Sequence, residues 1–298
     1  MSYFVCNQEY AFGIDLSVYN AGVNGSQYPD FDQIAAHVPQ VGFMALRTGQ
    51  SWGYKDEAFP IYLREALRIG VCLLPYHVIY PGEPALRQMD ALLNILEGVN
   101  LDTVRLVLDM ELEHDQSRAV ITNTLLSCIE FLMSETGRLP IIYSRALWLN
   151  EHVHVNDLPP VDWWLAQYHF RRAYPDYTPE YPCPPLLPGG VSRWLIHQTA
   201  ERGPAIGGAG RYMDYNRWNG TRANLLAYFG KKSDIPATVC PLNGLICTGR
   251  PNQIFNDALT NPSLADVAGR CEPTTQPEIS QSFQTTPVPT EQIHETKK

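Results

Sequence analysis

Two acidic residues separated by one position, Asp109 and Glu111, end a short apolar run over residues 106–108. The run has the length and character of a strand that is buried on both faces. Side chains at positions i and i+2 of a strand project to one face, so both carboxylates should point the same way. Glycoside hydrolysis uses such a pair: one acid protonates the leaving oxygen, and a carboxylate handles the positive charge at the anomeric carbon.

Other apolar runs and helix signals predict the elements that position this pair. We expect strands at residues 13–17, 41–48, 71–80, 105–111, 140–143, 162–168, 194–199 and 212–216. We expect helices at residues 30–38, 59–69, 84–96, 115–135 and 222–229, with Asp30 and Asp115 as N-caps and with Gly70 and Gly137 ending two of them. Five strand–helix units followed by three strands predict an α/β fold, an irregular TIM-type barrel of the (β/α)5(β)3 kind with parallel strands.

We also place two further acids, Asp15 and Asp214, late in their strands, as we do Asp109 and Glu111. In a parallel barrel the C-terminal strand ends form one mouth, where the active site sits. Four acids from three strands should therefore converge at that mouth.

Eight short segments in this order resemble the glycoside hydrolase family 25 lysozymes, which are peptidoglycan muramidases. The segments are residues 13–17, 43–49, 76–77, 108–111, 140–144, 164–168, 198 and 213–218, and the similarity covers about residues 10–230. The resemblance implies a barrel of five helices and eight strands that cleaves the β-1,4 bond between N-acetylmuramic acid and N-acetylglucosamine. By position, Glu111 resembles the general acid, Asp109 its carboxylate partner, and Asp15 and Asp214 the flanking acids of the family.

Aromatic and polar side chains at the mouth are the expected substrate contacts: Tyr76, Tyr143, Trp164, Tyr168, Gln198 and Arg47. The aromatic residues could instead be barrel packing, and Arg47 could simply neutralise the acids. His77 is more simply a hydrogen-bonded structural histidine than a base. The sequence departs from the family where aromatic residues usually flank the glutamine, because His197 and Thr199 stand there.

The chemistry requires Glu111 to hold a proton near neutral pH, and nearby anions raise its pKa for that purpose. Asp109 would stay ionised and act either as a nucleophile or by orienting the acetamide group of the substrate. We favour the acetamide route, because a pair at i and i+2 of one strand is poorly placed to flank opposite faces of a sugar. No cofactor and no metal ion are expected.

Composition bounds the rest of the interpretation. The chain has 298 residues, which is enough for one large catalytic domain over residues 1–230, followed by an extension of unknown role over 231–271 and a disordered Pro/Thr/Gln-rich tail over 272–298. A net charge of −9 argues against a nucleic-acid partner, and no apolar run is long enough to span a membrane.

The N-terminus lacks the pattern of a signal peptide. We therefore expect an enzyme made in the cytoplasm that reaches the cell wall after release, as a phage or prophage lysin or on a particle bound through the tail. Cys6, Cys72 and Cys128 are expected to be buried thiols, and pairing of Cys240 with Cys247 stays open.

Two other functions compete with a muramidase. A catalytically silent barrel could bind glycans or a protein, although a binding module has no need to gather four acids. A chitinase-like glycosidase could share the barrel, although the segment around Glu111 lacks the longer acidic ladder of chitinases.

Overall fold

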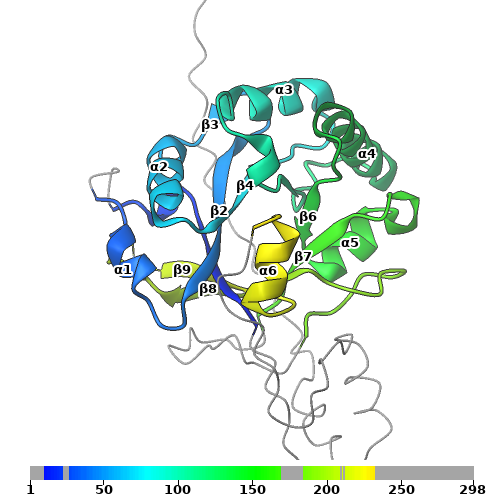
Figure 1. Cartoon of the computed structure of the whole chain (residues 1–298). Coiled ribbons are helices and arrows are strands. Elements are labelled where there is room, and N and C mark those ends of the chain that lie inside the picture. The colour runs from blue at the N-terminus through cyan, green and yellow to red at the C-terminus, as the bar shows by residue number, and fades with distance from the viewer. Residues whose placement is uncertain (1–9, 23–26, 169–183, 209, 211, 232–298) are drawn as a thin grey trace, which may run out of the picture.

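The structure is a computed structural model that describes residues 10–22, 27–168, 184–208, 210 and 212–231 (Figure 1). Its strands are β1 Phe12–Leu16, β2 Val41–Gln50, β3 Tyr54–Lys55, β4 Cys72–Val78, β5 Val107–Asp109, β6 Ile141–Ser144, β7 Asp162–Ala166, β8 Ile196–Pro204 and β9 Tyr212–Trp218. Its helices are α1 Phe31–Ala35, α2 Phe59–Ile69, α3 Ala85–Ile95, α4 Arg118–Thr136, α5 Ala146–His152 and α6 Arg222–Tyr228, with short 3-10 turns η1 Val18–Asn20, η3 Leu101–Thr103 and η4 Val155–Asp157.

Several expectations fall outside the described residues. They are the segments after Lys231, including the proposed extension and tail, and the cysteines Cys6, Cys240 and Cys247. Cys72 and Cys128 are buried free thiols, as expected.

The strands close into a barrel. The order around the sheet is β1-β9-β8-β7-β6-β5-β4-β2, and β1 also pairs with β2, which completes the ring, while β3 adds a short hairpin to β2. Helices α1 to α5 follow β1, β2, β4, β5 and β6 in the chain, and Figure 1 shows helices ringing the barrel. The predicted irregular TIM-type barrel is therefore confirmed.

One detail of that prediction is wrong, because the strands are not all parallel. The last strand, β9, runs antiparallel to both of its neighbours, β8 and β1. The loop between β8 and β9 is too short for the crossover that parallel neighbours require, so the two strands form a hairpin.

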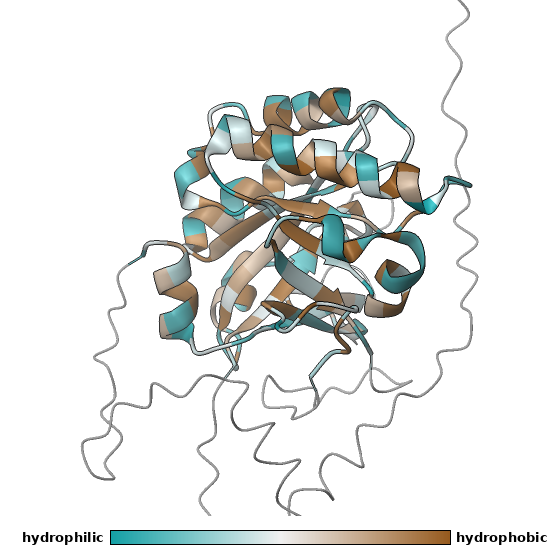
Figure 2. Cartoon of the chain, turned by 90° about the vertical axis from the view of Figure 1, so that its right-hand side faces the viewer, coloured by the Kyte–Doolittle hydropathy of each residue, from teal (hydrophilic) through white to brown (hydrophobic). Residues whose placement is uncertain are grey.

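Successive side chains of each strand point alternately into the barrel and toward the helices, which gives two separate hydrophobic cores. Residues facing the barrel interior, such as Phe43, Leu74 and Trp164, form one cluster, and residues facing the helices, such as Met44 and Leu108, form the other. Figure 2 shows hydrophobic residues along the strands and mixed hydrophobic and hydrophilic positions along the helices, which matches helices with one face on the barrel.

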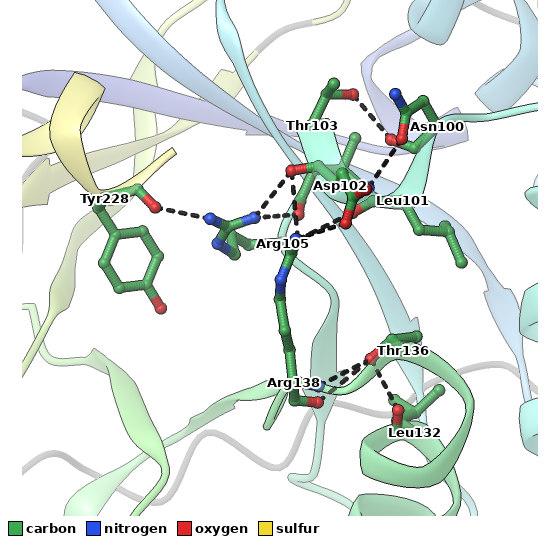
Figure 3. A network of polar contacts seen from close by, with 10 residues as sticks. Asn100, Leu101, Asp102, Thr103, Arg105, Leu132, Thr136, Arg138 and Tyr228 are labelled. Atoms are coloured by element: carbon green, nitrogen blue, oxygen red, sulfur yellow. Dashed lines mark hydrogen bonds and ion pairs between the residues drawn. The ribbon is translucent and has the colours of Figure 1, made fainter. Parts of the chain in front are cut away.

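Helix α6 closes the end of the barrel where the parallel strands begin. Its residues Leu225 and Phe229 belong to the interior cluster. Arg105, just before β5, donates from Nη2 to the carbonyl of Tyr228 at 2.7 Å and lies 5.3 Å from the centroid of the Tyr228 ring. Figure 3 shows the network of polar contacts that extends from this arginine to Arg138 and the end of α4. The opposite end of the barrel is left as the mouth.

Local signals placed most helix ends correctly. Asp30 caps α1 by accepting from the backbone amides of Asp32 and Gln33, and Gly70 and Gly137 take left-handed conformations at the ends of α2 and α4. The expected cap of α4 at Asp115 is wrong. Ser117 is the cap, because Asp115 has φ 56° and belongs to a turn before the helix.

A buried ion pair connects the mouth to the helical layer. Asp56 accepts from Arg47 Nε at 2.7 Å and from the backbone amides of Val18 and Ala58, each at 3.0 Å. The Asp56 side chain is fully buried. One carboxylate therefore links the end of β1, strand β2 and the start of α2.

Replacing Asp56 by asparagine should lower the free energy of unfolding by about 3 kcal/mol, because it leaves the buried guanidinium of Arg47 without its counter-charge. Urea denaturation at pH 7 measures this. Asp32→Asn is the matched control, since Asp32 pairs with Arg68 on the surface. Equal small effects of the two substitutions would show that the Arg47–Asp56 pair does not stabilise the fold.

Candidate active site

The four predicted acids lie together at the mouth of the barrel. Asp15 is the fourth residue of β1 and pairs with Asp214 of β9 in the sheet. Asp109 ends β5, and Glu111 follows two residues later, on the same face. Besides burial, the charge of Glu111 raises the pKa of Asp109, and the charge of Asp15 raises the pKa of both, which indicates that the three groups are close in space.

Asp214 reaches this mouth for a reason that the sequence analysis did not anticipate. It is the third of seven residues in β9, so the expectation that it lies late in its strand is wrong. Because β9 runs antiparallel to β1, its beginning lies at the end where β1 finishes. The predicted convergence is correct even though its stated cause fails for this residue.

Hydrogen bonds from two side-chain amides hold the Asp15 carboxylate inside the barrel. Its Oδ2 accepts from Gln198 Nε2 at 2.9 Å and from Asn216 Nδ2 at 2.8 Å. Asp15 is only 5% exposed, so an unsatisfied charge there would be strongly destabilising. The two amides from β8 and β9 supply the donors that water would otherwise provide.

Aromatic donors in turn fix the orientation of both amides. The hydroxyls of Tyr143 and Tyr168 donate to Gln198 Oε1 at 2.8 and 2.7 Å. Trp164 Nε1 donates to Asn216 Oδ1 at 2.8 Å. Because the amide oxygens accept these bonds, the amide nitrogens must face Asp15.

Asp15 and Asp214 share a hydrogen bond between their carboxyl groups. Burial raises the pKa of both groups, and the charge of Asp15 and this bond raise the pKa of Asp214 further, while the bonds from Asn216, Gln198 and Asp214 favour ionised Asp15. Asp214 is therefore the member of the pair that holds a proton more tightly.

Asp109 and Glu111 form a second interacting pair. Burial and then the charge of Glu111 raise the pKa of Asp109 well above its ordinary value. Burial also raises the pKa of Glu111, with the charges of Asp15 and Glu201 adding to it and that of Arg145 opposing it. Among the residues that the structure describes, Asp109 Oδ1 is buried without a hydrogen-bond partner. Such an orphaned acceptor is typical of a site that receives a donor from outside.

The other predicted site residues take several positions. Tyr143, Trp164, Tyr168 and Gln198 support Asp15, and Trp164 is only 2% exposed, so its ring offers almost no surface to a sugar. Tyr76 lies edge-on to Trp164 and remains half-buried at the mouth.

Arg47 lies at the edge of the acid cluster. It is paired with Asp56 and lies 4.9 Å from the ring centroid of Tyr19. Burial and the charge of Glu111 raise the pKa of Asp109, and the charge of Arg47 partly offsets that rise. His77 is buried, and its ring nitrogens form hydrogen bonds with the Thr48 hydroxyl and the Ser51 carbonyl. Burial lowers the pKa of His77 to about 4, so it is a neutral structural residue.

The sequence analysis missed three residues of the site. Asn216 stands two positions after Asp214, so the same rule of alternation that paired Asp109 with Glu111 could have identified it. Glu201 lies in the part of β8 that extends beyond Gln198 toward the hairpin, and Arg145 follows β6 directly. No local motif marked either of them.

Within the described ranges, no group of three or more potential ligands is arranged to hold a metal ion. Within the same ranges, none of the helices combines the length and the hydropathy needed to cross a lipid bilayer.

A TIM-type barrel with clustered carboxyl groups at its mouth, whose pKa values burial raises, fits the class of carboxylate-dependent glycosidases. Residues 14–207 match the family described as Glycosyl hydrolases family 25. The chain therefore belongs to that family, which confirms the resemblance that the short motifs carry.

Known proteins agree with this assignment. Lysozyme M1 of Streptomyces globisporus is 23% identical over 226 residues, which cover 72% of this chain and 70% of that protein. The uncharacterized protein YegX of Escherichia coli K12 is 27% identical over 163 residues, and the alignment covers 54% of this chain and 53% of YegX. The chain thus spans about half the length of YegX, with 53% covered in the K12 protein and 42% in that of Escherichia coli O157:H7.

The fold is shared with solved structures. The bacterial lysozyme from Streptomyces coelicolor superposes with a TM-score of 0.59 at 20% identity, covering 74% of this chain and 96% of that one. The barrel of this chain therefore has the same fold as that lysozyme.

Asp109→Asn should stabilise the protein at neutral pH. Folding raises the pKa of Asp109 above 3.8, so the folded state binds the proton more tightly and the wild type loses stability as the pH rises above about 4. Asparagine carries no such loss, and the variant should be more stable at pH 7 by about 1 kcal/mol or more, since one pKa unit corresponds to about 1.4 kcal/mol.

Urea denaturation at pH 7 and pH 4 measures the difference, which should shrink toward zero at the lower pH. A variant that is no more stable than the wild type at pH 7 would show that Asp109 is not held in an unfavourable buried state.

Proposed function

We propose that the protein is a peptidoglycan hydrolase that cleaves the β-1,4 bond between N-acetylmuramic acid and N-acetylglucosamine. The observation that carries this proposal is the buried, unpartnered Oδ1 of Asp109 beside Glu111 at the barrel mouth. Family membership and the similarity to lysozyme M1 support the class of substrate.

Glu111 is the proposed proton donor. It is half-buried, so it can reach a substrate while burial and the acids around it keep its pKa raised. A glutamic acid that keeps its proton near neutral pH can deliver it to the glycosidic oxygen as the bond to the anomeric carbon breaks.

Asp109 is the proposed partner that orients the acetamide group of the muramic acid. The acetamide N–H would donate to Asp109 Oδ1, and its carbonyl oxygen would attack the anomeric carbon as the leaving oxygen takes the proton of Glu111. Water, deprotonated by the Glu111 carboxylate, would then attack the same carbon and release the acetamide oxygen.

Substrate binding would also divide the roles of the two acids. In the free protein, burial raises the pKa of both Asp109 and Glu111; the charge of Glu111 raises that of Asp109 further, and the charges of Asp15 and Glu201 raise that of Glu111. A donor on Asp109 favours its ionised form, so the proton that the pair retains would lie on Glu111 once the acetamide is bound.

Asp15 and Asp214 provide a fixed negative charge beside this pair. The two amides that donate to Asp15 favour its ionised form, and a proton on Asp214 would favour it further. A preorganised anion near the anomeric carbon would stabilise the positive charge that develops there in the transition state.

Glu111→Gln should abolish turnover while leaving the fold intact, because glutamine matches the shape of glutamic acid but cannot release a proton. The measurement is mass spectrometry of digested peptidoglycan, where the wild type should produce reducing ends on muramic acid and the variant at least about 100-fold fewer.

Reducing ends on glucosamine would make the enzyme a glucosaminidase. A wild type that gives no products but still binds glycan would favour a catalytically silent barrel. Turnover by Glu111→Gln at the wild-type rate would refute the assigned role of Glu111.

We further propose that residues 1–230 form the catalytic domain and that the enzyme acts on the cell wall after release, as a phage or prophage lysin or on a particle bound through its tail. All residues of the acid cluster and its supporting network lie between Asp15 and Asn216. The C-terminal segment would then serve delivery rather than catalysis.

Removal of residues 272–298 should therefore leave hydrolysis of soluble peptidoglycan fragments unchanged. Release of reducing sugar, together with the thermal unfolding midpoint of full-length and shortened protein, tests this expectation. A shortened chain that does not fold would show that the tail is part of the domain.

A further inference from the structure

Arg145 stands beside Glu111 at the mouth. Strands β5 and β6 are parallel neighbours in which Asp109 pairs with Tyr143. Arg145 lies two residues beyond Tyr143 and keeps an extended backbone, with φ −110° and ψ 137°. Glu111 lies two residues beyond Asp109, so Glu111 and Arg145 occupy equivalent positions just past the ends of adjacent strands, and the charge of Arg145 acts on Glu111.

The guanidinium of Arg145 is not committed to the protein. Its residue is exposed, and within the described part of the chain no hydrogen bond or ion pair engages its side chain. The other arginines near the site are paired: Arg47 with Asp56 at 2.7 Å, and Arg202 with Glu201 at 3.5 Å. The guanidinium thus faces solvent next to the proposed proton donor.

An ion pair between Arg145 and Glu111 would work against catalysis. A guanidinium held on the carboxylate favours its ionised form, and a proton donor must keep its proton. The structure brings the two residues into neighbouring positions without such a pair. Among the described residues, Arg145 acts on Asp109 at the end of β5 and on Glu111 just beyond it, and Glu201 of β8 acts on Glu111 from a different strand.

The chemistry of the substrate limits what such a cation can meet. The sugar units of the glycan are uncharged, because their amino groups are acetylated. Anionic groups are carried by the lactyl-peptide arm of muramic acid, which is the sugar that contributes the anomeric carbon of the scissile bond. A free guanidinium beside the proton donor is therefore placed to meet this arm rather than the glycan backbone.

We propose that Arg145 is a specificity-determining residue that binds a carboxylate of the peptide arm on muramic acid. This inference rests on the proposed hydrolase function and names the part of the substrate that the β6 side of the mouth recognises. Arginine suits the task, because its planar fork of donors matches a carboxylate. It also supplies a positive charge at a mouth lined by acids, which repel an anionic substrate when they are ionised.

The test removes the charge of Arg145 and the charge of the substrate carboxylates, separately and together. Wild type, Arg145→Gln and Arg145→Lys are assayed on intact peptidoglycan fragments and on the same fragments after their carboxylates are converted to methylamides. On intact fragments, Arg145→Gln should lower kcat/KM by about tenfold, mainly through KM, and lysine should restore part of it. On the amidated fragments, the wild type and Arg145→Gln should be alike.

Arg64→Gln is the matched control, because it makes the same change in net charge on the outer surface of α2 and should not alter either substrate. Equal losses on both substrates, or a shifted pH profile with an unchanged substrate ratio, would show that Arg145 acts through Glu111 and would overturn the proposal. No loss on either substrate would overturn it as well. A wild type that releases no muramic acid ends from either substrate would instead contradict the proposed function.

Discussion

The site depends on holding one buried carboxyl group, that of Asp15, inside the barrel. A charge in that position is tolerated only because Gln198 and Asn216 both donate to it. Their orientation is set by hydroxyl and indole donors from Tyr143, Tyr168 and Trp164. Each side chain of this network supplies a hydrogen-bond partner to the next, so the polar groups around Asp15 have fixed orientations.

The architecture separates this polar layer from the apolar layers below it. Phe43, Trp218 and residues of α6 fill the closed end of the barrel, and the acids begin where that packing stops. The close fit at the closed end includes Gly13, where a Cβ would lie 2.4 Å from the Phe43 ring. Apolar packing dominates one end of the barrel and the polar site the other, so buried carboxylates with raised pKa values persist in a stable fold.

The barrel and the convergence of its acids could be predicted from the sequence, because both predictions depend on short-range patterns. Alternation within a strand predicted that Asp109 and Glu111 share a face, and five strand–helix units predicted the mouth. The direction of β9 could not be read in the same way, since strand polarity depends on long-range pairing. Arg145 and Glu201 were missed for a related reason: each matters only through a neighbouring strand, and no local pattern marks such a contact.

The same limit applies to the aromatic residues. Their types suggested sugar stacking, but the structure shows that the hydrogen-bonding groups of Tyr143 and Trp164 point to the amides around Asp15. Composition alone cannot separate an aromatic side chain that contacts a ligand from one that positions a catalytic group. In this barrel the distinction follows from burial, which leaves Trp164 only 2% exposed.

The most direct measurement is a crystal structure of the Glu111→Gln protein with a bound muramic acid oligosaccharide. The proposed mechanism predicts the acetamide N–H of the muramic acid on Asp109 Oδ1, with the glycosidic oxygen against the side chain at position 111. A glycan that binds away from these acids, or an acetamide that points away from Asp109, would contradict it.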